Sequence, residues 1–322
     1  DDESDEAKVR SLVEKLIDED EVDLLMGPYG SGLTLAAAET AEAAQCVVWN
    51  HRGSADEIFE CNLKWVVGIL SPASQYLCAI LELLRTLDPD AKRIALFSAK
   101  TGFATDMASG ALAWIRGEGY TLTTHQSYRS GFEDFGSLLN PLKDDPPDWF
   151  LGVGRLEDDI RLGRQLCEVR PRFKAACLVV VAISRFKAEL GERAEGFFAP
   201  SQWEPQVEYS VDCGPAQNVF LAHYLKGATV PIDYPGAQGY AAGVIAQHCV
   251  EDVGSLNQKS LRDAASRLRC TTFYGPYAIE AQTGLQTAHP ILVTQWKKGR
   301  KEIVWPREVA EAEPIYPGLF WE

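Results

Sequence analysis

The stretch Gly27-Pro28-Tyr29-Gly30-Ser31-Gly32-Leu33-Thr34 lies between an apolar run at 22–26 and an alanine-rich run at 35–42. The first run is typical of a strand and the second of a helix, so the glycines are predicted to form the turn between them. Free backbone N–H groups and the positive helix end favour an anion in such a turn. Gly27, Gly32 and Thr34 approach the phosphate-loop pattern, but Leu33 replaces its lysine. The loop therefore predicts a site for a small anion such as a carboxylate, not for a nucleoside triphosphate.

The composition narrows the class of protein. The chain has 322 residues, which is long enough for two lobes with cores of their own. Acidic residues outnumber basic ones by 46 to 31, and the resulting net charge of -15 argues against a nucleic-acid partner. The longest apolar run, 175–183, is much shorter than the roughly 20 residues that a membrane-spanning helix needs, so it predicts a buried strand.

Eight cysteines are spread along the chain. No two of them form a C-x-x-C pair, which argues against a zinc site or a thioredoxin-type redox site. Cys46, Cys177 and Cys249 lie in apolar stretches, so we expect them to be small core residues. The spacing predicts no disulfide framework and favours either a reducing compartment or thiols that are simply buried.

Helical and strand-like patterns alternate along most of the chain. The apolar residues of 9–17 fall on one face of a helix. Strands are also predicted at 22–26, 46–49, 93–97, 121–127, 148–153, 176–182 and 195–199, and helices at 74–86, 104–117, 133–143, 156–169, 215–226, 236–252 and 259–268. This alternation indicates an α/β protein with parallel sheets and helices on both faces. Residues 291–305 predict a terminal β-hairpin with a glycine turn.

Ligands of open α/β sheets bind beyond the carboxyl ends of the strands. Polar or aromatic residues follow several predicted strands, at 49–54, 98–103, 152–155 and 195–196. We expect these segments to be the walls of one cleft between two lobes.

The ordered motifs of the chain point to a family. They are the segments at 1–5, 27–34, 54–59, 195–196, 200–205 and 272–276, followed by Gln295-Trp296 and Val304-Trp305-Pro306. With these motifs the chain resembles the type I periplasmic binding proteins of branched-chain amino-acid ABC transporters, the leucine/isoleucine/valine-binding class. The resemblance covers essentially the whole chain.

The resemblance implies two doubly wound lobes that are joined by three crossovers and close on a small ligand. One lobe is expected to comprise 1–70 plus 203–275, and the other 71–202 plus 276–322. Family members carry a first strand and helix before the Asp-Asp-x-Ser-Asp segment, whereas this sequence begins at that segment. The resemblance therefore implies a first sheet without its central strand.

The resemblance also implies a clamp for a zwitterion. Ser31, in the loop with Tyr29 and Gly30, and Ser54, after Gly53, are expected to hold the ligand carboxylate. Glu195, followed by Gly196, matches the acidic residue that meets the α-amino group. Ser31 could equally be a plain helix cap, and Glu195 could be a surface glutamate.

Other matching positions depart from the family pattern. Arg52 stands where relatives tend to have a small residue, and it either favours a second acidic group on the ligand or points to solvent. Phe103 and Arg155 occupy positions where the second lobe often presents tyrosines, and Arg155 argues against a branched-chain ligand. Phe103, Trp203 and Tyr234 either shape the pocket or simply pack.

The resemblance implies a solute-binding protein that captures an amino acid or related small carboxylate and delivers it to an ABC import permease. We expect it in the periplasm or as a cell-surface lipoprotein, although the sequence opens without a signal-peptide pattern. No cofactor, metal or catalytic group is expected, because no metal-binding, nucleophile or dinucleotide motif is complete. The alternative is a cytoplasmic ligand-sensing regulator of the same fold, of the amide-sensor kind, favoured by the many cysteines.

Overall fold

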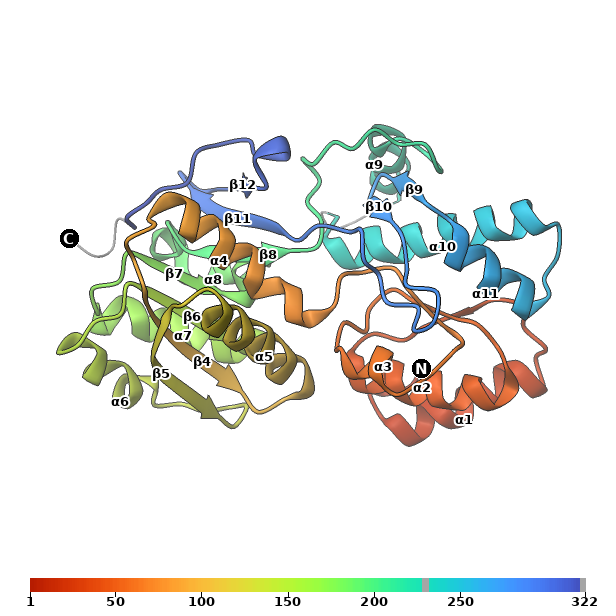
Figure 1. Cartoon of the computed structure of the whole chain (residues 1–322), viewed down its shortest axis with the longest axis horizontal. Helices are drawn as coiled ribbons and strands as arrows, with labels where there is room; N and C mark the ends of the chain where they lie inside the picture. Colours follow the sequence, from red (N-terminus) through yellow and green to blue (C-terminus); the bar gives the residue numbers. More distant parts are fainter. Residues whose placement is uncertain (228–231, 319–322) are drawn as a thin grey trace. The chain divides into compact units, whose positions relative to one another are not determined.

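The computed structural model describes residues 1–227 and 232–318. The chain forms two compact units (Figure 1), and it passes three times from one to the other. Unit 1 comprises Asp1–Pro72 and Gln202–Pro290, and unit 2 comprises Ala73–Ser201 and Ile291–Glu322. Both are α/β, which confirms the predicted fold class. Within the described residues, no helix combines the length and apolar character needed to cross a membrane.

Unit 1 is built on a three-stranded parallel sheet in the order β1-β2-β3. Its elements are β1 (Leu25–Met26), β2 (Val48–Asn50), β3 (Val66–Gly68), α1 (Glu6–Asp18), α2 (Ser31–Ala44), α3 (Glu57–Glu60), α9 (Gln217–Leu225), α10 (Tyr234–Val253), α11 (Gln258–Arg267) and the antiparallel pair β9 (Cys270–Thr272) and β10 (Gly275–Tyr277). The sequence predicted α1 correctly, and the Asp5 carboxylate caps it by accepting a hydrogen bond from the backbone N–H of Lys8. β1 lies at one edge of the sheet, where Leu24 and Met26 are exposed.

Residues 276–290 lie in unit 1, whereas the sequence assigned them to the second lobe. The physical reason is hydrogen bonding. β10 pairs with β9, and the carbonyl of Gly284 accepts from the N–H of Gly68 at the end of β3. The boundary between the units therefore falls at Pro290, after this irregular segment and not before it.

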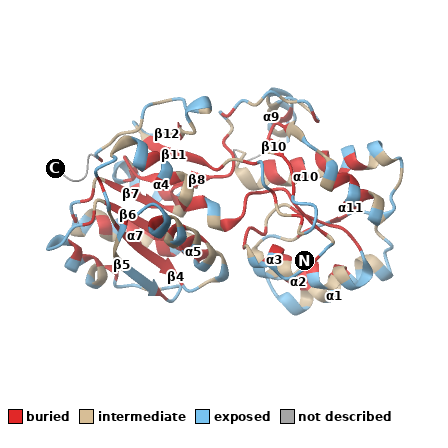
Figure 2. Ribbon diagram, in the orientation of Figure 1, coloured by how far each residue is buried: buried red, intermediate tan, exposed pale blue. Residues whose placement is uncertain are grey.

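Unit 2 is built on a seven-stranded sheet in the order β12-β11-β8-β7-β6-β4-β5. Its elements are β4 (Arg93–Ala99), β5 (Thr121–Tyr128), β6 (Trp149–Val153), β7 (Ala175–Leu178), β8 (Phe198–Ser201), β11 (Leu292–Lys297), β12 (Arg300–Trp305), α4 (Tyr76–Leu87), α5 (Gly102–Gly117), α6 (Phe135–Leu139), α7 (Leu156–Val169) and α8 (Ser184–Leu190). Helices α4 and α5 cover one face and α7 and α8 the other, so the strands β4, β6, β7 and β8 are almost wholly buried, whereas β5 at the edge of the sheet is largely exposed (Figure 2). The terminal hairpin is confirmed, with β11 antiparallel to both β8 and β12.

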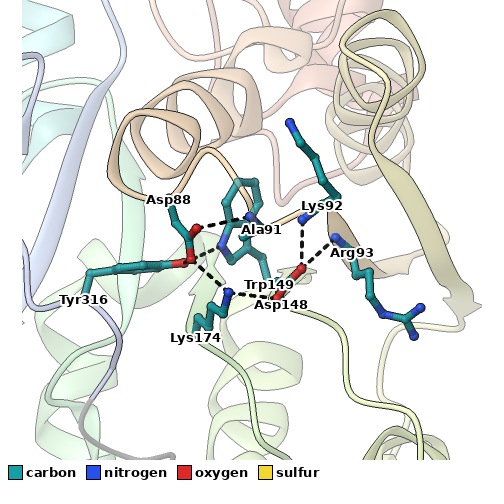
Figure 3. A network of polar contacts seen from close by, with 8 residues as sticks. All are labelled: Asp88, Ala91, Lys92, Arg93, Asp148, Trp149, Lys174 and Tyr316. Atoms are coloured by element: carbon teal, nitrogen blue, oxygen red, sulfur yellow. Dashed lines mark hydrogen bonds and ion pairs between the residues drawn. The ribbon is translucent and has the colours of Figure 1, made fainter.

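The amino ends of the central strands carry a polar network (Figure 3). Lys174 pairs with Asp88 at 2.9 Å and with Asp148 at 3.2 Å. The hydroxyl of Tyr316 donates to Asp88 at 2.9 Å and accepts from the indole N–H of Trp149 at 3.1 Å. Backbone N–H groups at the start of β4 donate to Asp148. The network thus fixes the C-terminal segment to the end of the sheet at which the central strands begin.

A second network joins the three segments of unit 1 that lie next to its boundaries. The amide of Gln202 donates to the Ser71 carbonyl at 3.0 Å and accepts from the Ser71 N–H at 3.2 Å. The Ser71 hydroxyl donates to the carbonyl of His289 at 2.7 Å, and the His289 Nε2 lies 2.7 Å from the Gln202 carbonyl oxygen. All three residues are buried, so each crossover leaves unit 1 from a fixed point.

Candidate functional site

The glycine-rich loop at 27–34 is the turn between β1 and α2, as the sequence predicted. The backbone N–H of Gly27 donates to the carbonyl of Trp49, which holds the loop against the end of β2. Gly30 is the N-cap of α2 at a φ of 99°, and no side chain caps the helix. The conformation favours glycine, and it leaves the first N–H groups of a 14-residue helix pointing out of its end.

The loop after β2 packs against this helix end. The Asn50 side chain holds the loop closed, since its amide donates to the Gly53 carbonyl at 2.7 Å and its oxygen accepts from the Gly53 N–H at 2.8 Å. The N–H of Ala55 donates to the Ser31 hydroxyl oxygen at 3.0 Å. Because Ser31 accepts this bond, its own proton is available to donate to an anion. The structure thus brings Ser31 and Ser54 into adjoining loops.

Arg52 projects a cation into the same region. One terminal nitrogen donates to the carbonyl of Pro235 at 2.9 Å, near the start of α10, and the guanidinium lies 5.4 Å from the ring centre of Tyr29. Its Nε is buried and has no hydrogen-bond partner within the described residues. Arg52 is only half-exposed, and its guanidinium is held by contacts within unit 1. Tyr234, the first residue of α10, adjoins Pro235.

Two of the predicted site residues in unit 1 have structural roles. A Cβ on Gly53 would lie 2.6 Å from the Cβ of Thr34, so glycine is needed there for loop packing. Trp203 is 1% exposed, packs edge-on against Phe220 and Phe273, and donates its indole N–H to the Phe273 carbonyl. It belongs to the core, which was the alternative that the sequence left open.

Glu195 does not offer a free carboxylate. Its Oε1 accepts from the ammonium of Lys187 at 2.7 Å and from the N–H of Gly299 at 2.8 Å, in the turn of the β11–β12 hairpin. Burial alone would raise the pKa of Glu195, but these hydrogen bonds lower it overall. Gly196 has a φ of 78° and donates its N–H to the carbonyl of Trp296. Both residues therefore anchor the hairpin.

Phe103 and Arg155 lie at the starts of two helices of unit 2. Phe103, in the first turn of α5, is half-buried and meets Tyr76 edge-on at 5.6 Å between ring centres. Arg155 is exposed and is the N-cap residue of α7. Phe103 thus makes a packing contact, which agrees with the alternative that it simply packs. Arg155 presents its charge to solvent.

Unit 2 has a cavity of about 410 Å³ beside the N-terminus of α5. Its polar lining comprises Ser98, Lys100, Thr101, Thr105, Ser109, His125 and Ser127. The Ser98 hydroxyl lies 3.2 Å from the Nε2 of His125, and burial lowers the pKa of this histidine. The sequence identified 98–103 as a wall but missed His125 and Ser127, because only the register of β5 against β4 places them beside Ser98.

Comparison with known proteins agrees with this architecture. A family model described as periplasmic binding protein matches residues 1–301. A leucine-binding protein LivK from Thermotoga maritima aligns with a TM-score of 0.80 and 17% identity, over 94% of this chain and 85% of that one. An amino-acid ABC transporter substrate-binding protein from Pseudomonas fluorescens aligns with a TM-score of 0.81 and 18% identity, over 95% and 85%. A solute-binding protein of an ABC transporter from Rhodopseudomonas palustris, in complex with 3,4-dihydroxybenzoic acid, aligns with a TM-score of 0.76 and 16% identity. This alignment covers 94% of this chain and 82% of that one.

Proposed function

This chain belongs to the periplasmic binding protein family, and we propose that it captures a small carboxylate outside the cytoplasm for an ABC importer. Delivery to a membrane permease is the step that follows capture in this proposal. Structural neighbours whose names give such a role support it, namely a leucine-binding protein and an amino-acid substrate-binding protein. The resemblance inferred from the motifs of the sequence is confirmed at the level of the family.

One observation carries the choice of ligand class. The N-terminus of α2 has no side-chain cap, and the Ser31 hydroxyl beside it is free to donate. An anion placed there would meet backbone N–H groups, a hydroxyl and the positive helix end together. The nearby guanidinium of Arg52 adds a full positive charge with a buried, unused Nε within the described part of the chain.

Within the carboxylates, the proposal covers amino acids and aromatic acids. A solved neighbour holds 3,4-dihydroxybenzoic acid, which has a carboxylate but no α-amino group. The carboxylate of Glu195, expected to meet such an amine, is engaged by Lys187 and Gly299. This engagement favours a carboxylic acid without an amine over a zwitterion.

Isothermal titration calorimetry with a panel of amino acids and benzoic acids tests the proposal. We expect saturable heat with at least one acid and none with its methyl ester, because the ester removes the negative charge. Ser31→Ala should weaken binding about tenfold or more, the usual effect of deleting a hydrogen bond to a charged group.

Ser184→Ala is the matched control. Ser184 is the first residue of α8, as Ser31 is of α2, but it lies in the other unit. The dissociation constant should be unchanged in this variant. A folded protein that gives no heat with any acid of the panel would overturn the proposal, and equal binding of acid and ester would exclude the helix end as the carboxylate site.

A further inference from the structure

Three cysteines that are far apart in the sequence meet in unit 1. Cys213 lies in the segment before α9, Cys249 in α10 and Cys270 at the start of β9. Cys213 and Cys270 lie on adjoining backbone, because the N–H of Cys213 donates to the carbonyl of Thr271, the residue after Cys270, and the two thiols influence each other's pKa. Cys249 is the third member, near enough to Cys213 for their charges to interact. All eight cysteines are free thiols in the structure.

The backbone fixes the first two thiols next to one another. The N–H groups of Asp212 and Cys213 both donate to the carbonyl of Thr271, at 3.0 and 3.2 Å. In return the N–H of Thr271 donates to the carboxylate of Asp212 at 2.6 Å. Cys270 adjoins Thr271 and pairs with Tyr277 of β10. Both cysteines therefore sit on adjoining backbone segments that hydrogen bonds hold in place.

The two thiols differ in acidity. The neighbouring Cys270 thiol lowers the pKa of Cys213 to about 7, although burial opposes the change, and the charge of His248 lowers it further. The interaction with Cys213 and burial raise the pKa of Cys270. Cys213 is therefore the more acidic thiol of the pair and the better nucleophile. Cys213 is 4% exposed, so only a small oxidant reaches it.

We propose that Cys213 and Cys270 are a redox-active pair that peroxide converts to a disulfide, which ties the segment before α9 to β9. The Cys213 thiolate attacks one oxygen of hydrogen peroxide, the O–O bond breaks, and a sulfenic acid and water form once a proton is taken up. The sulfur of Cys270 then attacks the sulfenic sulfur, and the thiol proton leaves with the hydroxyl as a second water. The proposal does not depend on the identity of the carried solute.

Peptide mapping of the full chain tests the pair directly. Reduced protein is treated with stoichiometric hydrogen peroxide, remaining thiols are alkylated, and the protein is digested with trypsin. The three cysteines fall in separate peptides, 194–226, 227–259 and 270–297. We expect a cross-link between the first and the third. A cross-link from Cys213 to Cys249, or a Cys270 that stays fully alkylated, would overturn the proposal.

Trapping with dimedone distinguishes the roles of the two thiols. In Cys270→Ser the sulfenic acid has no resolving partner, so dimedone added together with urea after the peroxide step should label Cys213, whereas the native chain should show little label there. Cys249→Ser is the matched control and should keep the cross-link. If Cys270→Ser does not fold, the peptide map of the native chain still tests whether Cys213 and Cys270 form a disulfide. The disulfide should also raise the Tm of unit 1 by on the order of 10 °C, because it closes a long loop.

Discussion

Asp159 is a carboxyl group that is completely buried in the first turn of α7. Its Oδ2 accepts from the N–H of Val180 at 3.3 Å, and its Oδ1 has no partner among the residues that the structure describes. Burial raises the pKa of Asp159 to about 8, and the neighbouring Asp158 adds to the shift. The group therefore keeps its proton in the folded protein near neutral pH.

Asp159→Asn should stabilise the protein at pH 8. The pKa is higher in the folded than in the unfolded chain, so wild-type stability falls as pH rises from about 4 to about 8. The whole loss is on the order of 5 kcal/mol as an upper limit. The amide cannot ionise, so urea unfolding at a series of pH values should show this slope disappear. An unchanged slope would mean that Asp159 is ionised in the fold.

Asp158→Asn is the contrasting variant, since Asp158 is the buried neighbour with satisfied oxygens. It accepts from the N–H of Gly131 at 2.7 Å and from the hydroxyl of Ser130 at 2.9 Å. Replacing this carboxylate should destabilise the protein by about 2 kcal/mol, because charge-assisted bonds are lost. The two adjacent substitutions should therefore act in opposite directions at pH 8.

Single residues of the candidate site were predictable only where local chemistry decides their role. The positions of Ser31 and of the glycines at the start of α2 were predictable from the strand-turn-helix pattern, whereas the ligand-binding role of Ser31 stays a prediction. The roles of Glu195 and Trp203 were not, because Lys187 and the turn at Gly299 engage Glu195, and Phe273 covers Trp203. The pairing of Cys213 with Cys270 was equally invisible, since it depends on how β9 lies beside the segment before α9.

At the scale of elements, the C-terminal segment depends on the network around Lys174. The hydrogen bond that Lys174 donates to Asp88 raises the pKa of Lys174. Burial opposes ionisation of Asp88 and Asp148, but hydrogen bonds that include those from Lys174 lower both pKa values overall. The carboxylates therefore stabilise the fold above their unfolded pKa of about 4, and this stability is lost as pH falls through their lower folded pKa values. The ammonium of Lys174 stabilises the fold below about pH 10, and this contribution to stability is lost as pH rises through the folded pKa of the lysine.

Lys174→Met should remove the stabilising pairs of Lys174 with Asp88 and Asp148, and it should loosen the segment that carries Tyr316. The expected loss is about 1 kcal/mol, because the group is partly exposed and water screens its charge. Hydrogen exchange should show faster exchange in residues 312–318 than in the wild type.

Lys259→Met is the control for this change, because it breaks a solvent-exposed pair with Asp263. It should leave exchange in residues 312–318 unaltered. Equal exchange in Lys174→Met and the wild type would show that Tyr316 holds the segment without the lysine.

Helices and the hairpin followed their sequence patterns more closely than the short strands did. The apolar run at 176–182 predicted one strand, but β7 ends at Leu178 and Val179–Ala182 form a 3₁₀ turn. Hydrophobicity alone cannot distinguish the two, because both are buried. The turn brings the N–H of Val180 to Asp159, which is a tertiary contact.

At the scale of the molecule, the network of Ser71, Gln202 and His289 holds together the three boundary segments of unit 1. Gln202→Ala removes two hydrogen bonds to the Ser71 backbone and one from the Tyr274 hydroxyl. We expect unit 1 to lose about 3 kcal/mol, since buried donors and acceptors are left unpaired. Calorimetry should show its transition at lower temperature, with the transition of unit 2 unchanged.

Gln247→Ala provides the control, because Gln247 is exposed on α10 and its side chain hydrogen-bonds only Glu251 among the described residues. Acid should weaken the same region in the wild type. Burial lowers the pKa of His289 to about 4, so unit 1 loses stability as pH falls from about 6.5 to about 4. If the unfolding transition of unit 1 in Gln202→Ala coincides with that of the wild type, Gln202 does not hold the boundary segments together.

The two-unit organisation itself was predictable from the order of motifs, but its boundaries were not. The predicted boundary at 275 follows the last motif of the first lobe, whereas the structural one at Pro290 depends on the pairing of β10 and on Gly284. Such contacts carry no pattern that a single sequence displays.

The interleaving of the two units has a consequence for biosynthesis. Unit 1 takes its last segment from 202–290, and unit 2 takes β11 and β12 from the region after residue 290. A nascent chain that has reached residue 200 therefore contains neither unit in complete form, because the sheet of unit 2 still lacks β11 and β12 and unit 1 still lacks α10 and α11. A chain that must be threaded through a secretion channel before it folds is helped by this order of assembly.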